Sequence, residues 1–94
     1  MRKEIIMYNG KNLARVSKTK ALYAFYDGVP VYMYPNKANP YNGFIEPCII
    51  EKHDELDSFS TKLMMFECYM PKELGSYTKF FVEVAWQELD DMIR

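Results

Sequence analysis

Very few side chains in this chain could perform chemistry, because it has one histidine and two cysteines in 94 residues. His53 lies within the charged run Glu51–Glu55, which is typical of an exposed turn. A catalytic base needs a partner that orients it, and the sequence places none beside this histidine. We therefore expect no catalytic role for His53.

The two cysteines, Cys48 and Cys68, each have apolar neighbours. Neither belongs to the Cys-x-x-Cys or His-x-x-x-His spacing that marks a zinc site, so a Cys48–His53–Cys68 metal site is not expected. Glu67 disfavours the thiolate that a nucleophilic Cys68 would need. Free cysteine usually behaves as a small buried hydrophobe. The sequence thus predicts neither an enzyme nor a metal or cofactor site.

Tyrosines are more informative, since five of the eight fall between residues 23 and 41. Tyrosine has a large apolar ring with a polar tip and is enriched where proteins touch other molecules. Pro35 and Pro40 each remove a backbone donor, so the segment between them is expected to be a rigid surface loop. We expect Tyr23, Tyr26 and Tyr32 to pack a helix against a sheet. The predicted partner-binding residues bracket or fill the loop: Tyr34, Asn36, Lys37, Asn39, Tyr41 and Asn42.

Charge is unevenly distributed, although the net charge is only −1. Residues 1–52 carry eight Lys/Arg against four Asp/Glu, whereas residues 53–94 carry four against nine. Basic residues near aromatic rings are typical of a nucleic-acid surface, with cations for phosphates and rings for bases. A nucleic-acid-binding module is therefore the alternative function, although a solvated surface explains the same charges without a partner. The residues concerned are Lys11, Arg15, Lys18 and Lys20.

The elements that would position these residues include five runs rich in β-forming residues. Asn9-Gly10, between the first two runs, is the dipeptide that best fits a type I′ hairpin turn. Pro47 interrupts the fourth run, which is expected to be irregular or at a sheet edge. The runs are Lys3–Tyr8, Lys11–Val16, Val29–Tyr34, Phe44–Glu51 and Tyr77–Val84.

Three segments have apolar residues at helical spacing: Lys18–Asp27, Asp54–Met65 and a terminal segment from Trp86 to Ile93. Ser17 is placed to cap the first, and Gly28 to end it in the left-handed conformation. The stretch Met65–Met70 is compatible with a strand. The expected apolar faces of the later helices are Leu56, Phe59, Leu63 and Phe66, and Trp86, Leu89, Met92 and Ile93.

Together these elements predict one α+β domain over residues 1–94. It would contain a small antiparallel sheet of about four to five strands, with an N-terminal hairpin, packed with two to three short helices. No apolar run approaches the roughly 20 residues of a membrane span. The start Met1-Arg2-Lys3-Glu4 is unlike a signal peptide, so a cytoplasmic location without membrane association is expected.

Several short motifs follow one another along the chain. They are Ser17-Lys18-Thr19-Lys20-Ala21, Tyr26-Asp27-Gly28, Val31-Tyr32-Met33-Tyr34-Pro35, Phe59 with Phe66 before Cys68-Tyr69, and Glu73-Leu74-Gly75-Ser76-Tyr77 before Phe80-Phe81-Val82-Glu83. Their order resembles a family of small, mostly uncharacterised proteins carried by bacteriophages and mobile elements of gut-type bacteria. Phe44 stands where the family tends to have tryptophan, and Met70-Pro71 where it has Asn-Cys.

Small proteins from such elements include anti-CRISPR and other anti-defence inhibitors, which bind a host nuclease. The resemblance therefore implies a binding protein in the bacterial cytoplasm. Its partner would be a host defence protein such as a CRISPR nuclease complex, which it would block by steric docking through the loop that Tyr34 and Tyr41 bracket. The resemblance is compatible with either a monomer or a homodimer.

Overall fold

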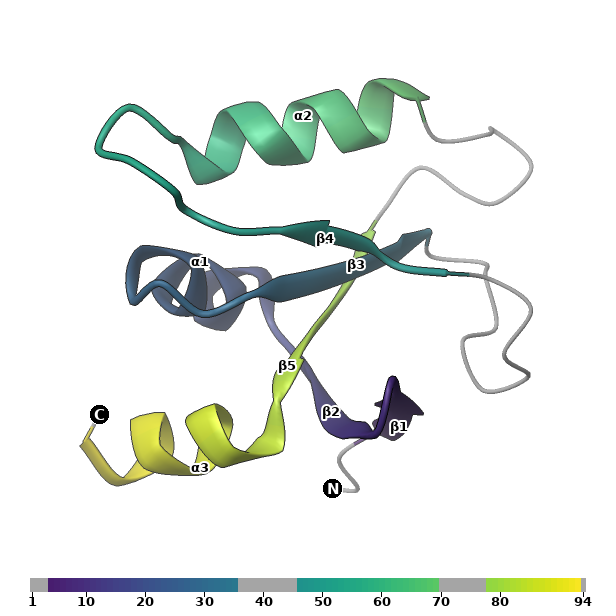
Figure 1. Cartoon of the computed structure of the whole chain (residues 1–94), viewed down its shortest axis with the longest axis vertical. Coiled ribbons are helices and arrows are strands. Elements are labelled where there is room, and N and C mark those ends of the chain that lie inside the picture. Colours follow the sequence, from purple (N-terminus) through teal and green to yellow (C-terminus); the bar gives the residue numbers. More distant parts are fainter. Residues whose placement is uncertain (1–3, 36–45, 70–77, 94) are drawn as a thin grey trace.

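The fold was analysed in a computed structural model that describes residues 4–35, 46–69 and 78–93. Within these ranges five strands and three helices follow one another along the chain (Figure 1). They are β1 (Ile5–Tyr8), β2 (Lys11–Val16), α1 (Lys18–Tyr26), β3 (Val31–Pro35), β4 (Cys48–Ile50), α2 (Phe59–Tyr69), β5 (Thr78–Glu83) and α3 (Val84–Ile93).

The five strands form one sheet in the order β1-β2-β5-β3-β4, and each neighbouring pair is antiparallel. The last strand in sequence, β5, therefore lies at the centre, with Leu13 of β2 opposite Glu83 and Tyr32 of β3 opposite Phe81. β4 lies at the edge, as the interruption by Pro47 led us to expect. The predicted α+β fold with an antiparallel sheet and an N-terminal hairpin is confirmed.

Local signals account for the hairpin and for α1. Asn9 and Gly10 have φ values of 49° and 76°, as a type I′ turn requires at both positions. The Ser17 Oγ accepts a hydrogen bond from the Lys20 backbone N–H at 3.2 Å and so caps α1. Gly28 ends the helix with a φ of 81°, and its N–H donates to the Phe25 carbonyl at 3.1 Å. These three predictions are confirmed.

The second helix begins later and ends later than predicted. The Asp54 carboxylate accepts the backbone N–H groups of Leu56 and Asp57, at 2.8 and 3.1 Å, which holds this stretch in a turn outside the helix. Ser58 is the cap, because its Oγ accepts the Thr61 N–H at 3.4 Å. Leu56 is consequently 92% exposed, and its predicted place on the apolar face is wrong.

The helix then continues through Tyr69, so a strand over residues 65–69 is also wrong.

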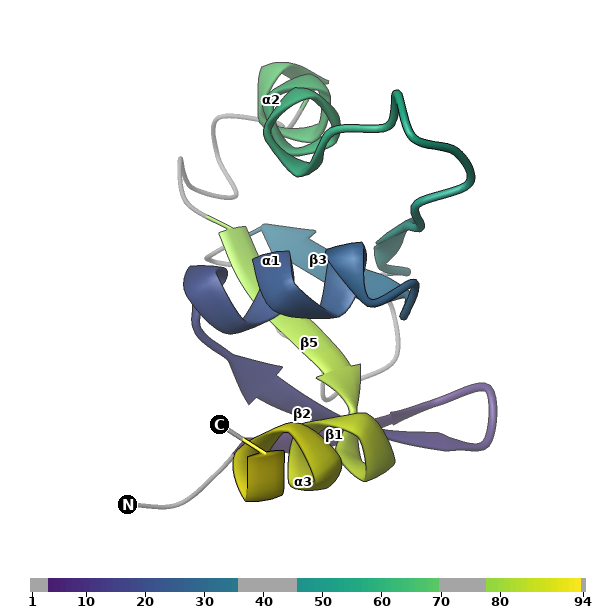
Figure 2. The same cartoon turned by 90° about the vertical axis from the view of Figure 1, so that its left-hand side faces the viewer.

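One core lies between the sheet and the helices. In Figure 2, α1 crosses in front of β5, with α2 above it and α3 below it. Phe59 of α2 joins the layers, because its ring lies 5.8 Å from that of Phe25 and 5.9 Å from that of Phe80. The buried residues of this core are Ala21, Ala24, Phe25, Val31, Met33, Ile50, Phe59, Leu63, Phe80 and Val82.

A second, smaller core occupies the opposite face of the sheet. Tyr8 of β1 and Tyr32 of β3 have ring centroids only 5.9 Å apart. Three strand spacings of about 4.8 Å, roughly 14 Å in all, would separate those strands in a flat sheet. The sheet must therefore curl so that this face is concave. Its buried residues are Ile6, Leu13, Tyr32, Tyr34 and Phe81.

The third helix turns a polar side toward α1, contrary to the predicted apolar stripe. Asp90 is only 3% exposed, whereas Leu89 and Met92 are exposed. The reason is an ion pair between the Lys20 ammonium and Asp90, with Asp91 also 2.7 Å from that ammonium. The predicted stripe is therefore wrong for Leu89 and Met92, because long-range charge pairing sets the helix rotation.

Trp86 of α3 nevertheless packs against the core, as predicted. Its indole Nε1–H donates to the Asp27 carboxylate at 3.2 Å, which ties the start of α3 to the end of α1. No described helix has the length and apolar character needed to cross a membrane.

Candidate protein-binding groove

Tyr34 does not belong to a surface loop. It lies in β3, it is 2% exposed, and its ring meets that of Phe81 edge-on at 5.5 Å. The strand runs through Pro35, and its two-residue period places Tyr34 with Tyr32 on the concave face. Burial raises the pKa of Tyr34. The prediction that Tyr34 contacts a partner is therefore corrected.

The other predicted loop residues, Asn36, Lys37, Asn39, Tyr41 and Asn42, lie outside the described residues, and their binding role stays a prediction.

The remaining tyrosines of the cluster also depart from expectation. Tyr23 and Tyr26 are 40% and 48% exposed, and Tyr32 is buried on the face opposite α1. Tyr26 does connect two helices, because its hydroxyl oxygen accepts the Phe59 backbone N–H at 3.3 Å. This bond satisfies a donor at the start of α2 that has no partner within the helix.

The basic residues proposed for nucleic-acid binding are mostly paired with carboxylates of the same chain. Lys11 lies 3.0 Å from Glu83, and Arg15 lies 3.3 Å from Glu4. The hydrogen bond to Glu83 raises the pKa of Lys11. Lys20 pairs with Asp90 and Asp91, whereas Lys18 is exposed on the first turn of α1. Three of the four cations thus have internal counter-ions, which weakens the nucleic-acid alternative.

The ion pair of Lys20 gives a stability prediction. Lys20→Met would leave Asp90 buried without its cation, and we expect a loss of about 2–3 kcal/mol in unfolding free energy. Lys18→Met, on the same helix, should change it by less than about 0.5 kcal/mol. Urea denaturation followed by circular dichroism measures both. Equal losses would show that the pair does not hold α3 against α1.

The described residues contain no group of three or more His, Cys, Asp or Glu side chains that could hold a metal. His53 is exposed, and its backbone N–H donates to the Asp57 carboxylate at 2.7 Å. Cys48 is half-buried on β4, and Cys68 is exposed on α2. Neither the imidazole nor the two thiols thus belong to such a group within the described residues.

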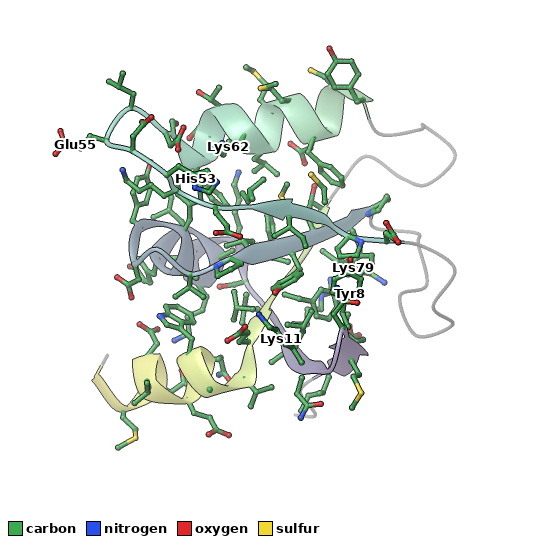
Figure 3. All side chains as sticks on the ribbon, in the orientation of Figure 1. Tyr8, Lys11, His53, Glu55, Lys62 and Lys79 are labelled. Atoms are coloured by element: carbon green, nitrogen blue, oxygen red, sulfur yellow. The ribbon has the colours of Figure 1, made fainter. Side chains whose placement is uncertain are left out.

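An apolar groove instead lies between α2 and the β3–β4 edge of the sheet. Its volume is about 420 Å³. Figure 3 shows Lys62 on the side of α2 that faces the strands. The described residues that line the groove are Pro35, Cys48, Ile50, Lys62, Met65, Phe66 and Tyr69.

The groove arises because only the first half of α2 is anchored. Phe59 and Leu63 are buried in the core, Phe66 is half-buried, and Tyr69 is exposed. Below the helix, Ile50 and Cys48 lie opposite Val31 and Met33 in the register and share their helix-facing side. The helix thus leaves this part of the sheet uncovered.

Large apolar side chains remain exposed around the groove. Met65 and Tyr69, which line it, are 55% and 85% exposed, whereas Met64 is 59% exposed but does not line it. Contiguous exposed apolar surface usually marks an interaction site, and methionine adapts its shape to different partners. Only Met65 of the two methionines lines the groove.

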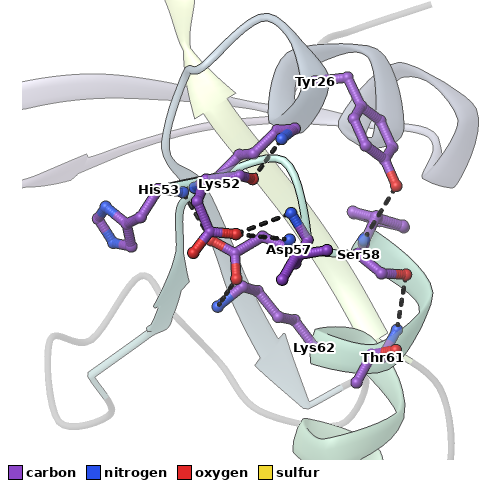
Figure 4. Close-up of polar contacts among 10 residues, drawn as sticks. Tyr26, Lys52, His53, Asp57, Ser58, Thr61 and Lys62 are labelled. Carbon is purple, nitrogen blue, oxygen red and sulfur yellow. Dashed lines mark hydrogen bonds and ion pairs between the residues drawn. The ribbon is translucent and has the colours of Figure 1, made fainter.

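The turn that joins β4 to α2 lies beside Lys62, which lines the groove (Figure 4). Asp57 Oδ2 accepts the backbone N–H groups of His53 at 2.7 Å and Asp54 at 3.2 Å, and these bonds lower the pKa of Asp57. The Lys62 ammonium lies 3.8 Å from the other carboxylate oxygen of Asp57. Side chains of the turn thus hold its own backbone in place. Lys62, in the first turn of α2, lies next to it.

No match to this chain was found among family models, curated proteins or solved structures. Its function is therefore argued from the groove and its surroundings.

Sequence reasoning did not find this groove, because residues 65–69 were expected to form a strand. A usable signal was nevertheless present. Once Phe59, Leu63 and Phe66 are assigned to the buried face, Met64-Met65 and Tyr69 remain as large apolar side chains without a place in the core. A continuous helical period through residue 69 would have placed Met65 and Tyr69 on the flank of the helix next to Phe66, with Met64 away from them.

The two cysteines allow a direct check of the groove's geometry. Burial raises the pKa of the Cys48 thiol, so it has less thiolate at pH 8 than an exposed thiol. We expect iodoacetamide to modify Cys68 severalfold faster than Cys48, with the Cys48 rate increasing as the pH is raised. Peptide mass spectrometry measures both rates, and they should become similar in urea. A Cys48 that reacts as fast as Cys68 in the folded protein would contradict this placement.

Proposed function

We propose that this chain is a small binding protein that docks onto a protein partner through the groove between α2 and the β3–β4 edge. The observation that carries this proposal is the exposed apolar lining of the groove. Met65 and Tyr69 are the expected anchors. Binding energy in interfaces concentrates in a few such side chains.

As the partner we propose a bacterial defence protein, with a CRISPR effector nuclease as the first candidate. The support for this target is the order of short motifs that resembles small phage and mobile-element proteins. Inhibition would be steric, because the groove offers apolar area on which a partner can dock. The protein would act in the cytoplasm of the bacterial host.

The test uses two neighbouring methionines of almost equal exposure. Cells with an active CRISPR system would express the chain and be challenged with a targeted phage, and expression should raise plaque counts. Met65→Asp should reduce this protection of the phage by about tenfold or more, because it places a charge inside the apolar groove. Met64→Asp, outside the groove, should protect the phage as well as the parent chain does.

Thermal denaturation of both variants must show that each is folded. Equal effects of Met65→Asp and Met64→Asp would remove the groove from the mechanism. Unchanged plaque counts with the parent chain would refute the CRISPR target. Binding of a purified CRISPR effector complex to the immobilised chain provides the matching measurement in vitro.

A further inference from the structure

One of the two edge strands of the sheet, β4, pairs with β3 on one side only. Among the described residues no strand adjoins its other side. Backbone N–H and C=O groups on that side point away from the sheet, and such an edge is a template for another strand. The groove runs along this same edge, since Cys48 and Ile50 of β4 both line it.

A strand added beside β4 would place its side chains in register with the groove. Side chains alternate between the two faces of a sheet, and residues two apart on one face are about 6.7 Å from each other. Every second side chain of the added strand would therefore face the same side of the sheet as Cys48 and Ile50, which line the groove together with α2 residues. A helical segment would fill the groove but could not use the backbone groups of β4.

The charge of the groove indicates which charged group a bound segment would carry. Lys62 is the one charged side chain among the described residues that line it. Its ion pair with Asp57 is long, at 3.8 Å, and the other Asp57 oxygen already accepts two backbone N–H groups. The Lys62 ammonium has three donors, so it can also bind an acidic group in the groove.

We propose that the groove takes an extended segment of the partner protein, which adds to β4 as a further strand. The segment carries apolar residues at alternate positions and a carboxylate that pairs with Lys62. Because β4 has three residues and follows Pro47, three or four residues of the segment pair with it. This inference rests on the proposed function and specifies how the partner is recognised.

The probe is a fluorescent hexapeptide of alternating valine and threonine that ends in glutamate. Two further versions of the peptide carry N-methyl groups. One version is methylated at the odd-numbered backbone amides and the other at the even-numbered ones. Only one set can face β4 in a given orientation, so one methylated version should bind at least about tenfold more weakly than the other. Fluorescence anisotropy measures the affinities. Equal binding of the two methylated versions would overturn strand addition.

Variants of the chain locate the site of binding. Met65→Asp and Lys62→Gln should each weaken peptide binding, whereas Met64→Asp should not. Bound peptide should also slow alkylation of Cys48 and hydrogen exchange of the β4 amides. Failure of the peptide to protect Cys48 and the β4 amides would also overturn the proposal.

The plaque assay with Met65→Asp and Met64→Asp would then still decide the proposed function. Loss of phage protection in Met65→Asp alone, without peptide binding to β4, would mean that the groove inhibits defence but takes no strand. Equal protection by Met65→Asp and Met64→Asp would mean that the groove has no role.

Discussion

Replacing Tyr34 by alanine is expected to lower the free energy of unfolding by about 3–5 kcal/mol, as is typical when a buried aromatic residue is truncated. Tyr34 is almost fully buried on the concave face and packs edge-on against Phe81. The curl of the sheet, which brings Tyr8 against Tyr32, leaves little room for the cavity to close. Urea denaturation at constant pH measures the effect.

Tyr23→Ala provides the matched control, since Tyr23 is 40% exposed on α1. We expect its loss to be below about 1 kcal/mol. The comparison also decides between two views of Tyr34. A residue that served only as an exposed contact would leave stability unchanged when truncated, so a loss similar to that of Tyr23→Ala would refute the buried position.

Phe59→Ala is expected to have a loss of similar size, about 3–5 kcal/mol. Its ring joins α2 to Phe25 of α1 and to Phe80 of β5, and the edge-on contact with Phe25 adds to the stabilisation from buried area. The same truncation should release the anchored half of α2, so that hydrogen exchange of this helix becomes faster. Denaturation and exchange measured by mass spectrometry give both results.

Leu56→Ala is the control for this prediction, because Leu56 lies three residues earlier and is 92% exposed. Its effect should be within about 0.5 kcal/mol. Phe59→Leu keeps most of the buried volume and is expected to remain folded. Phe59→Ala could instead lower the free energy of unfolding no more than Leu56→Ala does, while α2 of the Phe59→Leu variant exchanges as slowly as in the parent chain. Phe59 would then not be the residue that anchors α2.

The hairpin and α1 could be predicted from the sequence because their signals are local. Asn9-Gly10 tolerates positive φ at both turn positions, and Ser17 and Gly28 satisfy backbone groups of α1 within a few residues. These preferences act over one turn of chain and do not depend on the rest of the fold.

The rotation of α3 and the start of α2 could not be predicted in this way. Asp90 is buried and pairs with Lys20, which is far away in sequence. The carboxylates of Asp54 and Asp57 bind nearby backbone N–H groups and compete with helix formation before Ser58. Apolar spacing alone therefore placed Leu56 and Leu89 on buried faces.

The candidate site shows the same limit. Pro35 was interpreted as the start of a surface loop, but it is the last residue of β3, and alternation along that strand groups Tyr34 with Tyr32. Their burial follows from the curl of the sheet, which depends on β1. The groove also depends on tertiary structure, since it lies where α2 leaves the sheet.

The central position of β5 has a consequence for how the chain folds during synthesis. The N-terminal hairpin and the β3–β4 pair can each form early, but both present an open edge until residues Thr78–Glu83 enter between β2 and β3. Pairing over such sequence distances is slow, because long loops must close first. The two halves of the sheet therefore join only after the ribosome has made β5.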